Sequence, residues 1–259
     1  MFIHQLAREV WWYESTFPLN ALGFLAEPLY LRLYQRVPVI TVSASTKHDL
    51  LQLGFKGPIT IVPEGVEPIA ESAVAKPNEP HFLYVGRLAP SKRIDHIVRA
   101  LSLFRRETGT GQLWLIGTGS KRYQQSLTKL SRRLGLEDHI TFYGRVSSSE
   151  KHRMMATAHC LLVTSVREGW GLVVSEANAC GTPAIVYDVP GLRDSVRHEK
   201  TGLVVASTPA SLAAAMVRLT SDSGLYHRLA VEGRLWSGTL SFDDAARLAG
   251  LVLSARSAA

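Results

Sequence analysis

The stretch that decides the fold is residues 160–187, CLLVTSVREGWGLVVSEANACGTPAIVY. Its first run, Cys160–Thr164, predicts a strand, and the run lacks the alternation of a half-exposed strand, as expected when both faces are buried. A loop with two glycines leads to a predicted helix over Leu172–Cys180 and then to a second apolar strand over Pro183–Tyr187. Strand, helix and strand in this order indicate two parallel strands joined by a crossover helix.

The same alternation continues on both sides of this unit. Further strands are predicted at His81–Val85, Gln112–Ile116, Ile140–Tyr143 and Gly202–Val205, and further helices at Ser91–Glu107, Ser120–Gly135 and Ser148–Ala156. Strands that alternate with helices favour the α/β class, with a parallel sheet between two layers of helices. Three more helical segments close the chain, at Pro209–Thr220, Asp222–Trp236 and Ser241–Leu253.

A shorter block of the same kind precedes the strand at His81. It consists of a strand at Val37–Val42, a helix at Ser45–Leu53 and a strand at Ile59–Val62. Four prolines occur from Pro63 to Pro80, and they make the polar segment 64–80 the best candidate for a linker between two domains.

The composition is that of a folded protein, with 46% hydrophobic and 20% charged residues in a chain of 259. Only two cysteines occur, Cys160 and Cys180, which excludes a disulfide scaffold and favours a reducing compartment. The most apolar stretch, Leu19–Leu33, is interrupted by polar residues and a proline, so it falls short of a membrane span. The first residues, MFIHQLARE, do not form a signal peptide. We therefore expect a cytoplasmic protein.

The net charge of +7 is concentrated in the middle of the chain. Residues 87–153 hold 14 Lys and Arg against 5 Asp and Glu, whereas the rest of the chain holds 15 against 17. Such a field attracts phosphates, nucleic acids or acidic membrane surfaces, although many of these side chains fit solvated helix faces equally well. Sparse aromatic residues and the lack of a reader motif argue against nucleic acid as the partner.

Glycines and basic residues follow the predicted strands, at the edge where parallel sheets bind ligands. Gly86 allows a tight turn, and Arg87 and Lys92 bring two cations to the predicted start of a helix, which makes a candidate diphosphate clamp. Solvated basic residues at a helix start are the alternative. In the next strand-end loop, Gly117 and Gly119 allow a ligand to come close to the backbone, but they also fit a simple turn.

The sharpest local pattern is Glu168 and Glu176, eight residues apart, with Gly169 and Gly171 on either side of Trp170. The glycines expose backbone N–H groups at a predicted helix start, which suits an anionic ligand. Eight residues exceed two helical turns, so the two carboxylates can hold two separated hydroxyl-bearing parts of one ligand. A packed Trp170 and an exposed Glu176 are the alternative.

Several motifs taken together resemble one known family. They are Tyr84-Val-Gly-Arg-Leu88 with Lys92, Ile116-Gly-Thr-Gly119, Glu168-Gly-Trp-Gly-Leu172 with Glu176, Ala179-Cys-Gly-Thr-Pro183 and Gly202-Leu-Val-Val205. In order and spacing they resemble the donor-binding half of the retaining glycosyltransferases of the GT-B fold, in the large group 4 family. Upstream, Val39-Ile-Thr-Val-Ser-Ala-Ser-Thr46 and Ile61-Val-Pro-Glu-Gly-Val-Glu67 resemble the end of that family's acceptor domain and its interdomain link. Glu64 and Glu67 there replace the usual Asn and Asp.

The resemblance implies a role for each matching position. The donor diphosphate would be held by Gly86, Arg87 and Lys92, and the ribose hydroxyls by Glu176. The transferred sugar would be held by Glu168 and by the backbone of Gly169, Trp170, Gly171 and Leu172. Gly117 and Gly119 would line the nucleotide pocket, with the Val146 backbone near the base and His4 facing the sugar from the acceptor side. The implied catalytic residues are Glu168, His4, Arg87 and Lys92.

The reaction implied by the resemblance moves a sugar from a nucleoside diphosphate sugar to a carbohydrate or lipid-linked acceptor, with retention of the anomeric configuration. No Asp-x-Asp occurs in the sequence, so Arg87 and Lys92 would replace a metal ion at the diphosphate. We therefore expect no metal and no other cofactor. The motifs do not reveal the base or the sugar of the donor, or the acceptor.

The resemblance also sets the expected domains. They are the residual C-terminal part of the acceptor domain at 1–63, a linker at 64–80, the donor domain at 81–237, and a helix at 238–259 that crosses back to the acceptor domain. So short an acceptor half predicts an N-terminally truncated enzyme, with a catalytically incomplete nucleotide-sugar-binding module as the alternative. A Rossmann oxidoreductase fits less well, because neither a dinucleotide fingerprint nor Tyr-x-x-x-Lys occurs. The segment from Trp11 to Tyr34 would pack against the missing part or touch the inner face of the cell membrane peripherally.

Overall fold

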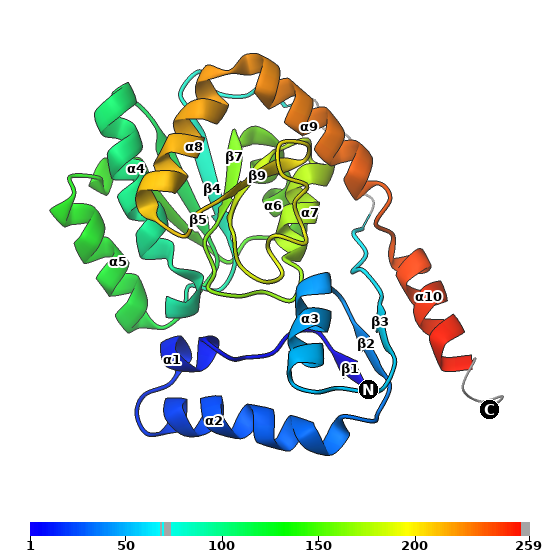
Figure 1. Ribbon diagram of the computed structural model, residues 1–259. Coiled ribbons are helices and arrows are strands. Elements are labelled where there is room, and N and C mark those ends of the chain that lie inside the picture. The colour runs from blue at the N-terminus through cyan, green and yellow to red at the C-terminus, as the bar shows by residue number, and fades with distance from the viewer. Residues whose placement is uncertain (68, 70–73, 255–259) are drawn as a thin grey trace.

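The computed structural model describes residues 1–67, 69 and 74–254, which form two parallel sheets (Figure 1). The larger sheet has six strands in the order β6-β5-β4-β7-β8-β9. Their bounds are β4 (His81–Val85), β5 (Gln112–Ile116), β6 (Ile140–Gly144), β7 (Cys160–Val163), β8 (Ala184–Tyr187) and β9 (Gly202–Val205). All of its strand pairs are parallel, which confirms the predicted α/β class.

Two groups of helices cover the two faces of this sheet (Figure 1). One group is α4 (Ile94–Thr108), α5 (Lys121–Arg133) and α8 (Pro209–Ser221), and the other is α6 (Ser148–Thr157), α7 (Leu172–Ala179) and α9 (Ser223–Ser237). The chain proceeds from β4 through β5 to β6 in one direction, and from β7 through β8 to β9 in the other. Because such crossovers are right-handed, the two directions send their helices to opposite faces. The strand order therefore reverses between β4 and β7, at the point where open α/β sheets bind ligands.

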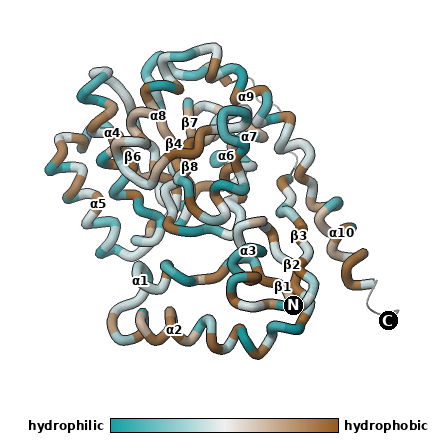
Figure 2. The backbone as a smooth tube through the Cα atoms, viewed as in Figure 1, coloured by the Kyte–Doolittle hydropathy of each residue, from teal (hydrophilic) through white to brown (hydrophobic). Residues whose placement is uncertain are grey.

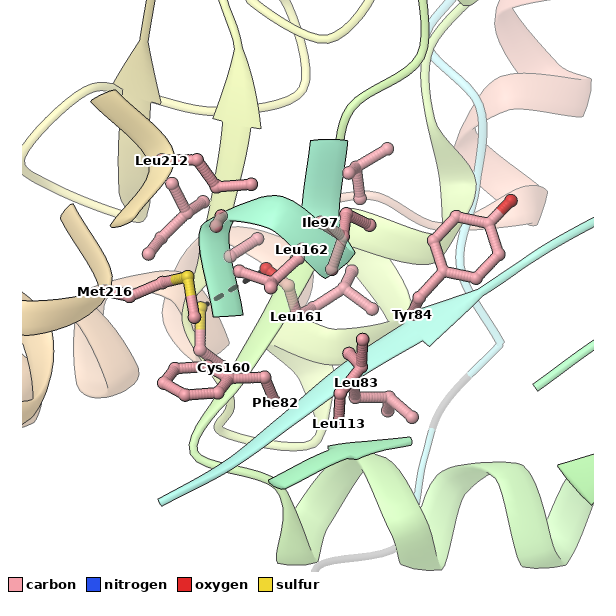
Figure 3. Packing of buried hydrophobic residues seen from close by; sticks show 14 of the residues in the cluster. Phe82, Leu83, Tyr84, Ile97, Leu113, Cys160, Leu161, Leu162, Leu212 and Met216 are labelled. Carbon is pink, nitrogen blue, oxygen red and sulfur yellow. Dashed lines mark hydrogen bonds between the residues drawn. The ribbon is translucent and has the colours of Figure 1, made fainter. Parts of the chain in front are cut away.

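The core of the large sheet consists of apolar side chains that are buried on both of its faces. Phe82, Leu83 and Leu161 on the central strands are fully buried, and Ile97 of α4 and Met216 of α8 pack over them (Figure 3). Cys160 and Cys180 are buried and unpaired, in agreement with the exclusion of a disulfide scaffold. The runs without alternation are thus confirmed as strands buried on both sides.

The smaller sheet contains β1 (Phe2–Ile3), β2 (Val39–Thr41) and β3 (Ile59–Ile61), all parallel and in that order. Helix α3 (Ala44–Gln52) follows β2, and its first turn is capped by the Ser43 hydroxyl, which accepts the N–H of Thr46. Three elements between β1 and β2 were not predicted: α1 (Val10–Glu14), α2 (Leu19–Leu31) and the 3₁₀ turn η1 (Arg32–Tyr34). The ring of Trp11 lies so close to Gly23 that a side chain there would collide with it, so this glycine lets α1 and α2 pack together.

Helix α2 exposes several apolar side chains. Apolar residues recur along it, as the brown segments of α2 in Figure 2 show. Leu19, Leu22, Leu25 and Leu29 are 59–64% exposed, and Phe17 just before the helix is 80% exposed. Among the described residues, no helix is both long and apolar enough to cross a bilayer.

The predicted helix Ser91–Glu107 is wrong at its start. Residues Pro90–Lys92 form a 3₁₀ turn, η2, and Arg93 then adopts a left-handed conformation with φ +49°, so α4 begins only at Ile94. The Thr164 hydroxyl lies 2.8 Å from the carbonyl of Lys92 and 3.1 Å from that of Arg93, and it stabilises this break by donating to them. Lys92 therefore lies in a tight turn before the helix. The other predicted boundaries differ from the structure by no more than two residues.

The predicted linker at 64–80 includes positions 68 and 70–73, which lie outside the described residues. Its first part passes close to the start of α10 (Phe242–Ser254), where the N–H of Val66 donates to the carbonyl of Leu240 at 2.8 Å. A Cβ on Gly65 would lie 2.2 Å from the nitrogen of Phe242, so glycine is needed at this crossing. No residue of α10 is buried, and its return to the acceptor domain stays a prediction. The last residues of that predicted segment, 255–259, also lie outside the described residues.

Candidate active site

A cavity of about 430 Å³ lies where the strand order of the large sheet reverses. The loop after β4 contributes Gly86, Arg87 and Lys92 to its wall. The loop after β7 contributes Ser165 and residues 168–173, which lead into the start of α7. The small sheet closes the other side with His4, Gln5 and Glu64. The cavity therefore brings together most of the residues singled out in the sequence.

Lys92 and Glu168 form an ion pair in this cavity. The Nζ of Lys92 donates to Oε1 of Glu168, and the same oxygen accepts the Ser165 hydroxyl at 2.6 Å. The two charged side chains are only 22% and 18% exposed. Partial burial strengthens such a contact relative to a surface pair, because less water screens it. The predicted diphosphate cation and the predicted sugar-binding carboxylate are thus direct neighbours.

Arg87 is paired with an acidic residue of the N-terminal segment. Its Nη1 lies 3.2 Å from Oε2 of Glu14, at the end of α1. The other oxygen of that carboxylate accepts the hydroxyl of Ser91 and, at 3.4 Å, its backbone N–H. The Arg87 side chain is 61% exposed, so it is free to turn toward a ligand. A protein carboxylate thus occupies the donors of the loop that was predicted to hold phosphate.

His4 directly follows β1, the strand-end position that the resemblance implies. Its Nδ1 lies 2.6 Å from Oε1 of Glu64, which follows β3. Glu64 is 18% exposed, whereas the imidazole is 58% exposed. The substitution of Glu for the usual Asn therefore supplies a carboxylate partner for His4.

The Gly-Trp-Gly segment shapes the loop between β7 and α7. Gly171, which precedes α7, has φ +94°, a conformation that favours glycine. A Cβ on Gly169 would lie 2.8 Å from the carbonyl oxygen of His4, so this glycine lets the two halves approach. Trp170 is 7% exposed, packs with Val42 and Trp236, and donates from Nε1 to the Ser175 hydroxyl at 3.1 Å. Its main contacts are therefore packing contacts, the alternative reading of the pattern.

Arg167 connects the same loop to α3 and to the segment before α1. Its guanidinium is 8% exposed and donates from Nε to Glu9 at 2.9 Å and from Nη1 to Asp49. Partial burial raises the pKa of Glu9, but the hydrogen bond from Arg167, a backbone hydrogen bond and the positive charges of Arg167 and Arg8 together outweigh it, so the pKa is lowered on balance. Residues far apart in the chain thus hold the segment next to Glu168.

Glu176 lies in a second, smaller cavity of about 210 Å³. Its Oε2 accepts a hydrogen bond from Nζ of Lys151 at 2.7 Å, and Gly65 and Phe242 also line this cavity. Leu172, at the start of α7, lines both cavities. Glu168 and Glu176 therefore face two adjoining spaces, an arrangement that suits a ligand with two hydroxyl-bearing parts.

Gly117 and Gly119 serve the packing of two loops. A Cβ on Gly117 would lie 1.8 Å from the carbonyl oxygen of Gly86, and one on Gly119 would lie 1.8 Å from that of Leu88. Neither glycine lines the two cavities described above, and Val146 is half-buried against the main core. At both glycines the backbone is therefore approached closely by the loop after β4. Their role in binding the nucleotide stays a prediction.

Three charged residues of the site were not singled out in the sequence: Glu14, Glu64 and Lys151. Glu64 carried a signal, because it departs from the usual Asn of the linker motif. No sequence signal pointed to Glu14 or Lys151, since their partners lie 73 and 25 residues away and only the folded chain brings them together.

Comparison with known proteins agrees with this geometry. The family model described as "Glycosyl transferases group 1" matches residues 66–236, which is most of the chain. The chain belongs to this glycosyltransferase family. The predicted resemblance is thereby confirmed, whereas the group 4 assignment within it stays a prediction.

Relatives in this family are longer than the present chain. An uncharacterized glycosyltransferase of Methanocaldococcus jannaschii is 30% identical over 213 residues, which are 75% of this chain and 54% of the relative. A GDP-mannose-dependent alpha-(1-6)-phosphatidylinositol monomannoside mannosyltransferase of Mycobacterium tuberculosis is 33% identical, over 61% of this chain and 42% of its own. The chain thus spans about half the length of the curated relatives it matches.

Solved structures share the fold. Sucrose-phosphate synthase from Thermosynechococcus elongatus superposes on 100% of this chain and 68% of its own, with a TM-score of 0.86 and 26% identity. HepE of Anabaena, solved with UDP-glucose, superposes on 88% of this chain and 66% of its own, with a TM-score of 0.79 and 20% identity. The GT-B type of arrangement expected from the sequence is therefore confirmed.

Proposed function

We propose that this protein transfers a sugar from a nucleoside diphosphate sugar to an acceptor hydroxyl, with retention of the anomeric configuration and without a metal ion. The observation that carries the proposal is the pairing of Lys92 with Glu168 in a cavity at the start of α7. The family and the UDP-glucose bound by HepE support a nucleotide sugar as the donor.

The chemistry requires stabilisation of a leaving anion. As the bond between the anomeric carbon and the phosphate oxygen breaks, its electron pair leaves with the nucleoside diphosphate. Lys92 and Arg87 supply positive charge there, and the first residues of α7, Leu172 and Val173, line the same cavity, where helix N–H groups favour an anion. These groups are in place before the reaction, so they need little reorganisation in the transition state. In this proposal they do the work of a metal ion.

The two carboxylates then bind different parts of the donor. Glu168 accepts hydrogen bonds from hydroxyls of the transferred sugar and is not cast as a covalent nucleophile. Glu176, held by Lys151 in the adjoining cavity, accepts those of the ribose.

The acceptor is a carbohydrate or a lipid-linked carrier. The mycobacterial relative is named for a phosphatidylinositol mannoside, which supports a lipid-linked acceptor. The exposed apolar face of α2 is the surface that would meet the inner face of a membrane in that case. A cytoplasmic location, in contact with the membrane only peripherally, is part of the same proposal.

A transfer assay tests the proposal. Incubation with UDP-glucose or GDP-mannose and a candidate acceptor should release nucleoside diphosphate and give a product whose anomeric proton has the donor's configuration by NMR. Inversion would contradict retention, and a full requirement for added Mg²⁺ after EDTA treatment would contradict metal independence. Tight nucleotide binding without any transfer would favour the alternative, a binding module that lacks a complete acceptor site.

A further inference from the structure

The contact between His4 and Glu64 points to a residue with an unassigned role. Nδ1 of His4 lies 2.6 Å from Oε1 of Glu64, although the two residues are 60 positions apart. They follow β1 and β3, the two outer strands of the small sheet. The motif that contains Glu64 usually has Asn there, so the carboxylate is a feature of this chain.

A carboxylate and an amide differ in which tautomer of the neighbouring imidazole they favour. An ionised carboxylate only accepts hydrogen bonds, so the proton of the neutral ring must be on Nδ1. Nε2 then carries a lone pair and accepts a hydrogen bond from another group. An amide can either donate or accept, so an Asn at this position would favour neither tautomer. Glu64 therefore decides which nitrogen of His4 is the acceptor.

The surroundings hold His4 beside the sugar-binding loop. The Thr46 hydroxyl donates to the His4 carbonyl at 3.2 Å, and that carbonyl also packs against Gly169, next to Glu168. The ring of Phe2 lies 4.6 Å from the imidazole, centroid to centroid. Within the described part of the chain Nε2 has no hydrogen-bond partner, and both His4 and Glu64 line the 430 Å³ cavity.

We propose that Glu64 is a positioning residue that keeps His4 in the form protonated on Nδ1. Nε2 of His4 then accepts a hydrogen bond from a hydroxyl of the sugar bound in the cavity. This inference rests on the proposed function. It means that Glu64 contributes to the higher affinity for a nucleotide sugar than for the nucleotide alone. Glu64 acts only through His4.

The first test determines the tautomer of the His4 imidazole in the absence of any ligand. In protein labelled with ¹⁵N at histidine, long-range ¹H–¹⁵N spectra at pH 8 report which ring nitrogen of His4 carries the proton. His4 is assigned from the signals that disappear in His4→Gln. We expect Nδ1–H in the wild type and loss of that preference in Glu64→Gln, with Glu64→Asn as a second variant if the first does not fold. Glu137→Gln, which removes a surface ion pair with Arg132, should change nothing. An unchanged His4 signal in Glu64→Gln or Glu64→Asn would overturn the proposal.

The second test compares ligands with and without the sugar. Dissociation constants of UDP and UDP-glucose, and of GDP and GDP-mannose, are measured by calorimetry. Glu64→Gln should lower the affinity for the nucleotide sugar by about three- to tenfold, which is the effect of one hydrogen bond. The affinity for the nucleotide without the sugar should change by no more than about twofold. In the His4→Gln background the same change should have no further effect.

The outcomes separate the two proposals. The role of Glu64 would be overturned if Glu64→Gln lowered the affinities for nucleotide and nucleotide sugar equally, or if it still lowered the affinity for the nucleotide sugar in the His4→Gln background. Neither result would contradict the proposed function. A wild type that binds none of the four ligands would overturn the proposed function and the sugar contact with it, whereas the spectra would still show whether Glu64 controls His4.

Discussion

The Nζ of Lys92 donates a hydrogen bond to Oε1 of Glu168, although the two residues lie 76 positions apart. Their loops follow β4 and β7, which are neighbours in the sheet, and so the topology brings the two charges together. The proposed diphosphate cation and the proposed sugar carboxylate thus neutralise each other before a donor binds. Any change to one of them alters the charge that the ligand meets at the other.

The substitution Glu168→Gln separates the two proposed roles. The amide leaves the charge of Lys92 uncompensated, so the affinity for nucleoside diphosphate should rise by about two- to fivefold, the range of a modest ion pair. The rate of sugar transfer should fall by about 100-fold, because the sugar loses a charged partner in the transition state. Calorimetry and initial rates measure the two effects. Loss of nucleotide binding together with activity would contradict this division of roles.

The pairing of Arg87 with Glu14 makes a related prediction. Because Glu14 occupies the Arg87 guanidinium and the donors of Ser91, its carboxylate competes with a phosphate. Glu14→Gln should therefore tighten nucleoside diphosphate binding by about two- to fivefold. Glu150→Gln removes a surface pair with Arg153 and is the matched control. Weaker binding in Glu14→Gln would show that Glu14 supports the site instead of competing for it.

Gly119 should contribute to the stability of the fold. A Cβ there would lie 1.8 Å from the Leu88 carbonyl, a backbone atom that cannot move aside cheaply. Gly119→Ala should lower the free energy of unfolding by about 1–3 kcal/mol. Gly250→Ala is the control, since its Cβ meets nothing within 4 Å inside a helix, and it should stabilise the protein by about 0.5–1 kcal/mol. Equal stability of the two variants in urea would contradict the packing role.

The stability of the protein should fall in acid because of His159. Its Nδ1 accepts the backbone N–H of His81 at 3.0 Å, and burial, with a contribution from Lys76, lowers its pKa to about 4. Unfolding restores a pKa near 6.5, so the unfolded chain binds the proton more tightly and stability is lost as the pH falls from 6.5 to 4.

A variant isolates this contribution. In His159→Asn the amide oxygen can still accept the His81 N–H but does not titrate. Between pH 6.5 and 4, urea unfolding should show that the wild type loses about 1–2 kcal/mol more than this variant, a figure that allows for partial exposure of the ring. Parallel pH profiles for the two proteins would contradict the assignment to His159.

The large sheet could be predicted from the sequence because its signals are local. Its strands are apolar runs buried on both faces, and glycines mark most of the strand-end turns. The break at Arg93 could not be predicted in this way. It depends on Thr164, a residue 71 positions away that holds the two carbonyls of the turn. The same limit applies to α1 and α2, whose packing depends on the fit of Trp11 against Gly23.

The candidate site was predictable where motif and geometry coincide. Lys92, Glu168 and the start of α7 meet in one cavity because strand ends in a parallel sheet share an edge. The contacts of its acidic partners were not predictable, since Glu14 at the end of α1 and Glu64 after β3 reach the site from the N-terminal part of the chain. Trp170 combines both readings of its pattern, because it lines the cavity while its side chain packs against Trp236.

The most direct test of the central claim is calorimetric titration with UDP, GDP, ADP and their sugars in the presence of EDTA, on wild type and Lys92→Ala. We predict that at least one nucleotide binds the wild type and that Lys92→Ala weakens it by about tenfold or more, as expected for a charged hydrogen bond. Absence of binding by all of them, or equal affinity of Lys92→Ala and wild type, would contradict a nucleotide-sugar site at this cavity.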